Sequence, residues 1–438
     1  MEVARLGGSP RAAAGMSMMD TFSYRGGELA CEACGATDIA REVGTPCYVY
    51  SRQAIEGNYR ALAEAFAPVA PLVCYSIKAN SNLAILKLLK DLGAGFDIVS
   101  GGELARALRV GADPSRIVFA GVGKTRAEIR QALQAGILMC NVESEPELAA
   151  IHAVASDLGT QARVALRLNP DIDPKTHRHI TTGKRETKFG IDLETARGLV
   201  ARMPQWPAVR LVGYHAHIGS QVTDPRPHAA SLAKLIAFAG ECAPPGGAIE
   251  YVNIGGGFGI DYVPGQAPPP SAFAALLVPL LAQAARPLKL IMEPGRFIVG
   301  NAGLLLTRVV YVKRNSDGRR FVICDAAMND LIRPALYDAH HRIWPVVSDR
   351  PFESDGLGPA DVVGPVCESG DFFAKDRPLP DVAAGDLLAI FGAGAYGFAM
   401  SSNYNTRPRA CEVLVDGDQH RVVRRRETCE DLIRQETL

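Results

Sequence analysis

The sequence predicts an α/β fold in which eight parallel strands and their helices close into a barrel, joined to a second, all-β domain (a sandwich or barrel). Three observations support this prediction. Eight apolar, β-type runs alternate with helical patterns from residue 73 to residue 296. After residue 301 the helical period almost disappears, and short β-type runs are separated by Gly, Asp and Pro. The chain has 438 residues, which exceeds the usual size of one domain.

The eight predicted barrel strands are short apolar runs. In chain order they cover residues 73–77, 96–99, 117–120, 138–142, 164–168, 211–217, 251–254 and 288–292. Strict alternation of strands with helices predicts parallel pairing through right-handed crossovers, and eight such strands close naturally into a barrel.

Helix signals occupy the segments between the first five strands. Residues 83–93 carry one apolar face and end at Gly93. The stretches "TRAE" at 125–128 and "SEPE" at 144–147 match the capping box that opens a helix. A further helical segment at 52–67 precedes the first strand, so it either plugs the barrel or joins its outer ring.

The β domain is predicted to be discontinuous. Four runs after residue 301 predict its strands: "LLLTRVVYVKRN", "RRFVICDAA", "DLLAIFGAG" and "CEVLVDG". The runs "FSYRGGELACEA" at 22–33 and "CYVY" at 47–50 precede the barrel and are expected to pair with this domain. We therefore expect a disordered extension at 1–21, joining strands at 22–50, the barrel at 51–300 and the β domain at 301–438. The long polar loop at 169–191 is predicted to be a lid or a substrate-binding excursion.

Composition excludes several classes of partner. Lys plus Arg equals Asp plus Glu, at 47 each, so no overall field attracts the chain to nucleic acid or to a membrane surface. No stretch of about 18 apolar residues predicts a membrane span, and the N-terminus lacks the apolar region of a signal peptide. The ten scattered cysteines suit reduced thiols, so we expect a cytoplasmic protein. Cys31 and Cys34 form a lone CxxC, whereas a structural zinc ion needs four ligands.

Barrel chemistry is placed at the carboxyl ends of the strands. Lys78 ends the apolar run "VCYSIKAN", where it is either a solvent-facing stop, a phosphate binder or an amine held for covalent chemistry. The glycines of "NIGGGFG" expose backbone N–H groups that suit a phosphate, and a tight turn explains them equally well. The polar groups and glycines predicted at this rim are Lys78, Asp97, Arg167, His217, Gly255, Gly256, Gly257, Glu293 and Arg296.

Two further motifs at the rim allow more than one interpretation. In "HAHIGSQ", His215 and His217 are two residues apart and would share one strand face, as in a metal-dependent hydrolase. In "MEPGRF", Glu293 ends a buried strand, so its carboxylate needs a cationic partner or a proton. Lys78 or Arg296 could supply that charge structurally, and a protonated heterocycle could supply it functionally.

Together these groups predict a pyridoxal 5′-phosphate site. The cofactor requires an amine for covalent attachment, an anion cradle for its phosphate, a carboxylate for its ring nitrogen and a flat group against its ring. Lys78 would supply the amine and the three glycines the anion cradle. Glu293 would supply the carboxylate and His217 the flat group. We expect the desolvated position of Lys78 to help supply the neutral amine.

The chain also resembles a known family, the barrel-type (fold type III) pyridoxal-phosphate-dependent decarboxylases, and within them the diaminopimelate decarboxylases. The resemblance extends from about residue 22 to the C-terminus. It depends on nine ordered motifs: "YSIKAN", "GFDIVSGGEL", "DPKTH…TG…KFGI", "HAHIGSQ", "NIGGGFG", "EPGR", "MNDLIRPALYDAHH", "GPVCESGD" and "GAGAYGFAMSSNYN". Ser76 and "HRHI" at 177–180 depart from the residues that are common in the family.

The resemblance implies a role for each matching residue. Lys78 would be the cofactor lysine, His217 would stack on the ring, and Glu293 would meet the pyridine nitrogen. Ser220, Gly255–Gly257 and Tyr396 would hold the phosphate, with Asp97 and Arg167 also at the cofactor. Arg296, Arg333, Tyr337 and Tyr396 would bind the substrate. Cys367 and Glu368 would reach into the neighbouring subunit's site in a head-to-tail homodimer. Cys367 is the candidate proton donor, and Lys78 is the alternative.

The expected reaction is decarboxylation of meso-2,6-diaminopimelate to L-lysine and CO2, the last step of lysine biosynthesis. Arg333 and Glu368 would recognise the distal end of the substrate, which carries both signs of charge. Ornithine, lysine and arginine lack a distal carboxylate to meet Arg333, so they are the less favoured substrates. Two different enzyme classes share some of these features: an alanine-racemase-like enzyme, which would have an arginine in place of Glu293, and a metal-dependent barrel hydrolase.

Overall fold

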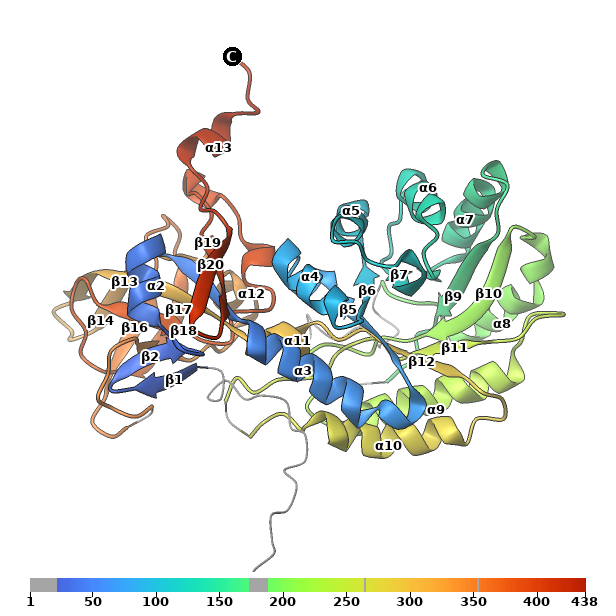
Figure 1. Ribbon diagram of the computed structural model, residues 1–438, viewed down its shortest axis with the longest axis horizontal. Coiled ribbons are helices and arrows are strands. Elements are labelled where there is room, and N and C mark those ends of the chain that lie inside the picture. The colour runs from blue at the N-terminus through green and yellow to red at the C-terminus, as the bar shows by residue number, and fades with distance from the viewer. Residues whose placement is uncertain (1–21, 173–187, 264, 353) are drawn as a thin grey trace, which may run out of the picture.

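The computed structural model describes residues 22–172, 188–263, 265–352 and 354–438 (Figure 1). The expected disordered extension at 1–21 and most of the expected lid, at 173–187, lie outside these residues. Figure 1 shows the barrel at one end of the molecule and the β domain at the other, with α3 running alongside the barrel.

Eight parallel strands form a closed barrel in the order β10-β11-β12-β5-β6-β7-β8-β9, which confirms the predicted fold class. Each predicted run overlaps one observed strand. The strands are β5 (Leu72–Ser76), β6 (Gly95–Ile98), β7 (Ile117–Phe119), β8 (Met139–Val142), β9 (Ala162–Arg167), β10 (Val209–His215), β11 (Tyr251–Asn253) and β12 (Lys289–Met292). The largest difference that affects the site is at β10, which ends two residues before its predicted end.

Helix α3 (Arg52–Ala65) joins the outer ring and does not plug the barrel. It packs against α4 (Leu83–Asp91), which follows the first barrel strand, and against α10 (Pro270–Ala282), which precedes the last. It therefore covers the junction where β12 pairs with β5. The remaining ring helices are α5 (Gly101–Arg109), α6 (Arg126–Ala135), α7 (Glu145–Asp157), α8 (Leu193–Ala201) and α9 (Arg226–Glu241).

One predicted capping box is complete and the other is half formed. At α6 the Thr125 hydroxyl accepts from the Glu128 N–H, and the Glu128 carboxylate accepts from the Thr125 N–H. At α7 Ser144 accepts from the Glu147 N–H, but the Glu147 carboxylate accepts from the Glu143 N–H and from Lys124. The Glu147 carboxylate therefore binds the ammonium group of Lys124, whereas a complete capping box would require it to accept from the Ser144 N–H.

The β domain is discontinuous, as predicted. Strand β4 (Cys47–Ser51), which precedes the barrel, lies between β13 (Gly303–Arg314) and β19 (Cys411–Asp416), antiparallel to the first and parallel to the second. The nine-stranded sheet is completed by β14 (Arg320–Cys324), β15 (Ile343–Pro345), β16 (Gly358–Val363), β17 (Phe372–Leu379), β18 (Leu387–Ile390) and β20 (Gln419–Arg424).

The segment at 22–33 pairs with the β domain through one isolated bridge, between Glu28 and Val347, and does not extend the nine-stranded sheet. It forms β1 (Phe22–Arg25) and β2 (Glu28–Cys31), which make a three-stranded sheet of their own with β3 (Cys34–Gly35). This small sheet contacts the β domain through the Leu29 N–H, which donates to the carbonyl of Val346 at 2.8 Å, and through a shared apolar cluster.

The apolar core is continuous between the barrel and the β domain. One cluster of buried side chains includes Phe96 and Leu211 of the barrel together with Val322 and Ile390 of the β domain. In the described part of the chain, no helix is long and apolar enough to cross a membrane.

Candidate active site

Lys78 lies directly after β5, in the short 3-10 helix η2 (Ile77–Ala79). Its Nζ donates to Oδ2 of Asp97, the third residue of β6, at 2.7 Å. The Ser76 hydroxyl donates to the same carboxylate oxygen at 2.6 Å, and the Asp97 side chain is fully buried. The amine is therefore held at the carboxyl edge of the barrel by a carboxylate that cannot be hydrated.

The charge state of Lys78 differs from the expectation. Burial lowers the pKa of the amine, but the negative charge of Asp97, with a smaller contribution from Glu293, outweighs burial and raises it. The expectation that desolvation favours the neutral amine is wrong for this arrangement, because the nearest neighbour is a carboxylate.

Glu293 follows β12 and is buried. Its Oε1 accepts from the side-chain amides of Asn141 at 3.1 Å and Asn253 at 2.6 Å, and its Oε2 lies 3.4 Å from Nε2 of His215. Burial alone would raise the pKa of Glu293, but His215 and Lys78 hold it below the usual value. The group is therefore a buried, ionised carboxylate, which suits a partner that carries a positive charge.

Sequence reasoning missed Asn141 and Asn253, the two amides that hold Glu293. Each is a lone amide inside an apolar strand, in β8 and β11 respectively. A polar side chain in a fully buried strand needs a hydrogen-bond partner, so these positions carried a usable signal.

The two histidines of "HAHIGSQ" do not form a pair on one strand face. Strand β10 ends at His215, which contacts Glu293, whereas His217 lies in the following loop and lines a cavity. His217 Nδ1 accepts from the Gly256 N–H at 3.1 Å. Burial, followed by the charges of Arg167 and Lys78, holds the pKa of His217 well below its usual value. Its ring is therefore neutral and flat.

Close packing explains the three glycines. A Cβ on Gly256 would lie 2.2 Å from the Glu293 carbonyl oxygen, and one on Gly257 would lie 2.4 Å from that of Gly219. The Gly255 N–H donates to Asn253 and the Gly256 N–H to His217. Within the described residues the Gly257 N–H has no acceptor, so this group is the free donor of the tripeptide.

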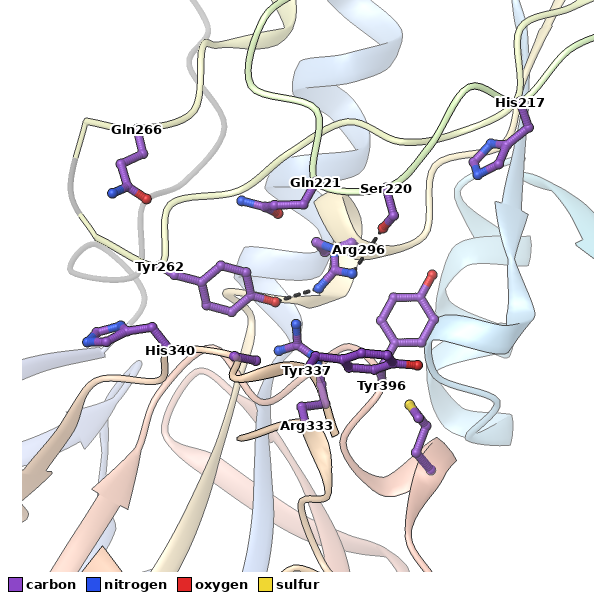
Figure 2. Close-up of a pocket in the computed structure, with 12 residues that line it drawn as sticks. His217, Ser220, Gln221, Tyr262, Gln266, Arg296, Arg333, Tyr337, His340 and Tyr396 are labelled. Atoms are coloured by element: carbon purple, nitrogen blue, oxygen red, sulfur yellow. Dashed lines mark hydrogen bonds between the residues drawn. The ribbon is translucent and has the colours of Figure 1, made fainter. Parts of the chain in front are cut away.

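A cavity of about 410 Å³ lies between the barrel rim and the β domain (Figure 2). Its lining residues are His217, Ser220, Gln221, Tyr262, Gln266, Arg296, Arg333, Tyr337, Ala339, His340, Tyr396 and Met400. The Tyr396 N–H donates to the carbonyl of Ala79 at 2.8 Å, which connects the cavity wall to the Lys78 segment.

Arg296 lies at the centre of this cavity wall and is buried. As Figure 2 shows, its Nη1 donates to the Tyr262 hydroxyl at 2.6 Å and its Nη2 to the Ser220 hydroxyl at 3.0 Å. Its guanidinium group also lies 4.9 Å from the centre of the Tyr396 ring. The structure therefore places Ser220, Tyr262 and Tyr396 around one guanidinium group.

A second buried arginine faces the same cavity. Arg333, the first residue of α12 (Arg333–Tyr337), lies 5.1 Å from the centre of the Tyr262 ring. Its Nη1 donates to Nε2 of His341, and Nδ1 of His341 donates to the Phe391 carbonyl, each at 2.8 Å. His341 is neutral, because burial and then the charge of Arg333 hold its pKa well below the usual value. Two fixed cations next to one tyrosine make this wall suited to carboxylates.

Tyr262 was not identified from the sequence. It lies in the loop after β11, where no pattern distinguishes it from a surface tyrosine. Burial raises the pKa of its hydroxyl, but Arg296 and Arg333 outweigh burial and lower it.

Six predicted site residues line this cavity: His217, Ser220, Arg296, Arg333, Tyr337 and Tyr396. Lys78, Asp97, Gly255–Gly257 and Glu293 lie outside its lining, and so do Arg167, Cys367 and Glu368. Arg167 pairs with Glu143 and lies 4.7 Å from the centre of the Phe189 ring. Cys367 and Glu368 are exposed in the loop between β16 and β17. That loop is held by Asp371, whose carboxylate accepts from the N–H groups of Met328 and Val366, each at 2.7 Å. The Asp371 side chain is buried, so it supports the loop from inside and does not face water.

The described residues do not support a metal site at Cys31 and Cys34. Cys31 and Cys34 are buried partners across β2 and β3, and burial raises the pKa of both thiols. Among the described residues, no three His, Cys, Asp or Glu side chains form a group that could hold a metal ion.

Known proteins resemble this chain over most of its length. Residues 52–300 match the family model described as the pyridoxal-dependent decarboxylase, pyridoxal binding domain. The diaminopimelate decarboxylase of Pseudomonas aeruginosa is 50% identical over 420 residues, covering 96% of this chain and 99% of the relative.

Two solved structures of diaminopimelate decarboxylases complexed with L-lysine are also similar. The Helicobacter pylori enzyme is 42% identical with a TM-score of 0.86, covering 91% of this chain and 98% of that one. The M. jannaschii enzyme is 39% identical with a TM-score of 0.90, covering 97% and 99%.

Proposed function

This chain belongs to the diaminopimelate decarboxylase family of pyridoxal-dependent decarboxylases, and from that premise we propose a complete assignment of its substrate, cofactor and site. It decarboxylates meso-2,6-diaminopimelate to L-lysine and CO2. The observation that carries the proposal is the presence of two buried arginines, Arg296 and Arg333, on one cavity wall adjoining the Lys78 segment.

The described residues fit pyridoxal 5′-phosphate as the cofactor. Lys78 offers the amine for covalent attachment, and Glu293 offers an ionised carboxylate for a protonated ring nitrogen. His217 offers a neutral ring for stacking. When bound, the cofactor supplies an electron-accepting ring that stabilises the charge left as CO2 departs.

The phosphate would be held by the Gly257 N–H, with Ser220 and Tyr396. Gly255 and Gly256, whose N–H groups donate to Asn253 and His217, would contribute by leaving no side chain in its way. Asp97 and Arg167 would act on this site indirectly. Asp97 holds the Lys78 amine, and the charge of Arg167 helps to keep His217 neutral.

Substrate recognition would depend on charge at both ends of the molecule. Diaminopimelate carries two carboxylates, and one remains after decarboxylation. Arg296 and Arg333, with Tyr337 and Tyr396, would bind carboxylate groups in the cavity. Ornithine and lysine carry a single carboxylate, so they would leave one buried guanidinium group without its partner, which costs binding free energy.

The remaining two residues would come from a second copy of the chain. Cys367 and Glu368 are exposed and do not line the cavity of their own chain, so a homodimer could place them at the partner's site. There Cys367 would donate a proton at the substrate Cα, and Glu368 would meet the distal amino group.

The racemase-like interpretation requires an arginine at the ring nitrogen, and the buried group at this strand end is Glu293. A direct test is to measure CO2 release from meso-diaminopimelate, ornithine, lysine and arginine with one enzyme preparation. We expect kcat/KM for diaminopimelate to exceed the others on the order of 10³-fold or more, because a site built for a polar group rejects analogues that lack it. Equal rates with ornithine or lysine would contradict the proposed substrate.

A further inference from the structure

Two cysteines lie side by side in the β domain, away from the cavity. Cys47 is the first residue of β4 and Cys411 is the first residue of β19, and the two are direct partners in the parallel register of these strands. Paired residues of neighbouring strands point to the same face, and both side chains belong to the apolar cluster under the small β1–β3 sheet.

The spacing of the strands suits a covalent link. Neighbouring strands lie about 4.8 Å apart, and disulfides form between Cα atoms roughly 4.4–6.8 Å apart. A disulfide also needs its Cβ atoms roughly 3.5–4.5 Å apart, so forming the link requires the two strand starts to approach by about 1 Å or less.

Cys411 also has the surroundings of a reactive thiol. Nη2 of Arg426 lies 3.7 Å from its Sγ, within the range of a hydrogen bond to sulfur. A hydrogen bond with Cys47 and the charge of Arg426 outweigh burial and lower the pKa of Cys411 to about 7. The pKa of Cys47 is raised, chiefly by the same hydrogen bond and by burial. Cys411 is thus the more acidic thiol of the pair, and when protonated its Sγ can donate to the Val43 carbonyl, 4.0 Å away.

Cys411 Sγ is buried but lies beside a side chain that is partly exposed to solvent. Cys411 is 3% exposed, but the Arg426 side chain next to it is only half-buried. Arg426 is therefore a half-buried neighbour of Sγ, on the side from which a small oxidant would approach.

We propose that Cys47 and Cys411 form an oxidisable thiol pair, in which a peroxide links β4 to β19 through a disulfide. The Cys411 thiolate attacks one oxygen of hydrogen peroxide, the O–O bond breaks, and the products are a sulfenic acid and hydroxide. Cys47 sulfur then attacks the sulfenic sulfur and displaces its oxygen, which leaves as water with the Cys47 proton. Two thiols lose two electrons in total, and one peroxide is reduced to two waters.

The test is to map the oxidised sulfurs of the holoenzyme. The reduced protein is exposed to hydrogen peroxide, the remaining thiols are alkylated after unfolding, and the peptides are identified by mass spectrometry. We expect a peptide pair linked through Cys47 and Cys411, with Cys411 lost faster than the exposed Cys429. The Cys47→Ser variant should lose the link and leave a sulfenic acid at residue 411 that dimedone traps.

Matched variants separate a specific pair from general oxidation. Cys429→Ser should leave the link unchanged. Arg426→Gln should slow its formation on the order of ten-fold, because a thiol with an ordinary pKa is mostly protonated at neutral pH. If Cys47 and Cys411 in the wild-type protein remain fully alkylatable while Cys429 is oxidised, the proposal is overturned. This result does not depend on any variant folding.

Discussion

Lys78 Nζ and Asp97 Oδ2 lie 2.7 Å apart at the ends of two neighbouring barrel strands, and this ion pair holds the amine of the candidate active site. The pair fixes the position of the amine, and it also raises the pKa of the proton that the amine must lose to act as a nucleophile. A bound substrate or cofactor that displaces the carboxylate would release the amine.

The first prediction concerns this pair. Asp97→Asn should lower the pKa of Lys78, because the nearest negative charge is replaced by an amide of the same shape. The amine is then neutral down to lower pH, so the pH midpoint for loading pyridoxal 5′-phosphate should fall by about one unit or more. The measurement is the rate of change in cofactor absorbance as a function of pH. Ser76→Ala keeps the carboxylate and should leave the midpoint nearly in place; an equal shift in both variants would argue against the proposed role of Asp97.

The second prediction concerns Glu293. Glu293→Gln should leave the cofactor bound and reduce kcat on the order of 10²-fold, the usual scale for losing one preorganised charge. Single-turnover and steady-state rates provide the measurement. Glu250→Gln is the control, since Glu250 precedes β11 at the opposite end of the strand and pairs with Arg163 and Arg210. A near-normal kcat in Glu293→Gln would mean that another group meets the ring nitrogen.

The depressed pKa of Glu293 also has a consequence for stability. A carboxyl group whose folded-state pKa lies below the unfolded value stabilises the fold above the unfolded pKa. That contribution is lost as the pH falls through the folded pKa, so it is present throughout the neutral range.

The third prediction concerns substrate binding by Arg333. Arg333→Met should raise KM for diaminopimelate on the order of 10- to 100-fold with a smaller change in kcat, because a charge-assisted hydrogen bond contributes about 1.5–3 kcal/mol. Arg320→Met provides the comparison, since Arg320 is a buried arginine of the same domain whose partners are Asp381 and backbone carbonyls. It should lower the melting temperature and leave KM unchanged. If Arg333→Met lowers the melting temperature as Arg320→Met does and leaves KM unchanged, Arg333 has only a structural role.

Much of the fold was predictable because its signals are local. Each barrel strand is a short apolar run, and periodicity located all eight. The boundary of β10 was not predictable, because "HAHI" remains apolar and alternating after the ladder to β9 ends at His215. The separate β1–β3 sheet also required tertiary information, since strand propensity does not say which strand is the neighbour.

The candidate site was predictable where one residue type performs one task at a strand end, as with Lys78 and Glu293. It was not predictable where a residue acts through long-range packing. Tyr262 matters because it lies beside Arg296 and Arg333, which are 34 and 71 positions away in the chain. The raised pKa of Lys78 likewise depends on Asp97, whose proximity follows from strand pairing and not from the local sequence.

The fourth prediction concerns the shared site. Lys78→Ala and Glu368→Ala should each be inactive alone, and mixing the two should restore activity if a dimer places Glu368 in the partner's cavity. A mixed dimer holds one site with both lesions and one with neither, so random exchange should recover roughly one quarter of wild-type sites by two-fold symmetry. Subunit exchange is followed separately with two differently tagged chains. Full exchange without recovered activity would place both residues within one chain.

Every role proposed at the site depends on Lys78 being the lysine that bonds to the cofactor. Reduction of the holoenzyme with borohydride fixes the pyridoxal group on the lysine that holds it, and peptide mapping then identifies that lysine. We predict the label at residue 78 and its loss in Lys78→Ala, which should still fold. A label at another lysine, such as Lys124, whose side chain is buried beside Glu147, or Lys234 in α9, would contradict this assignment.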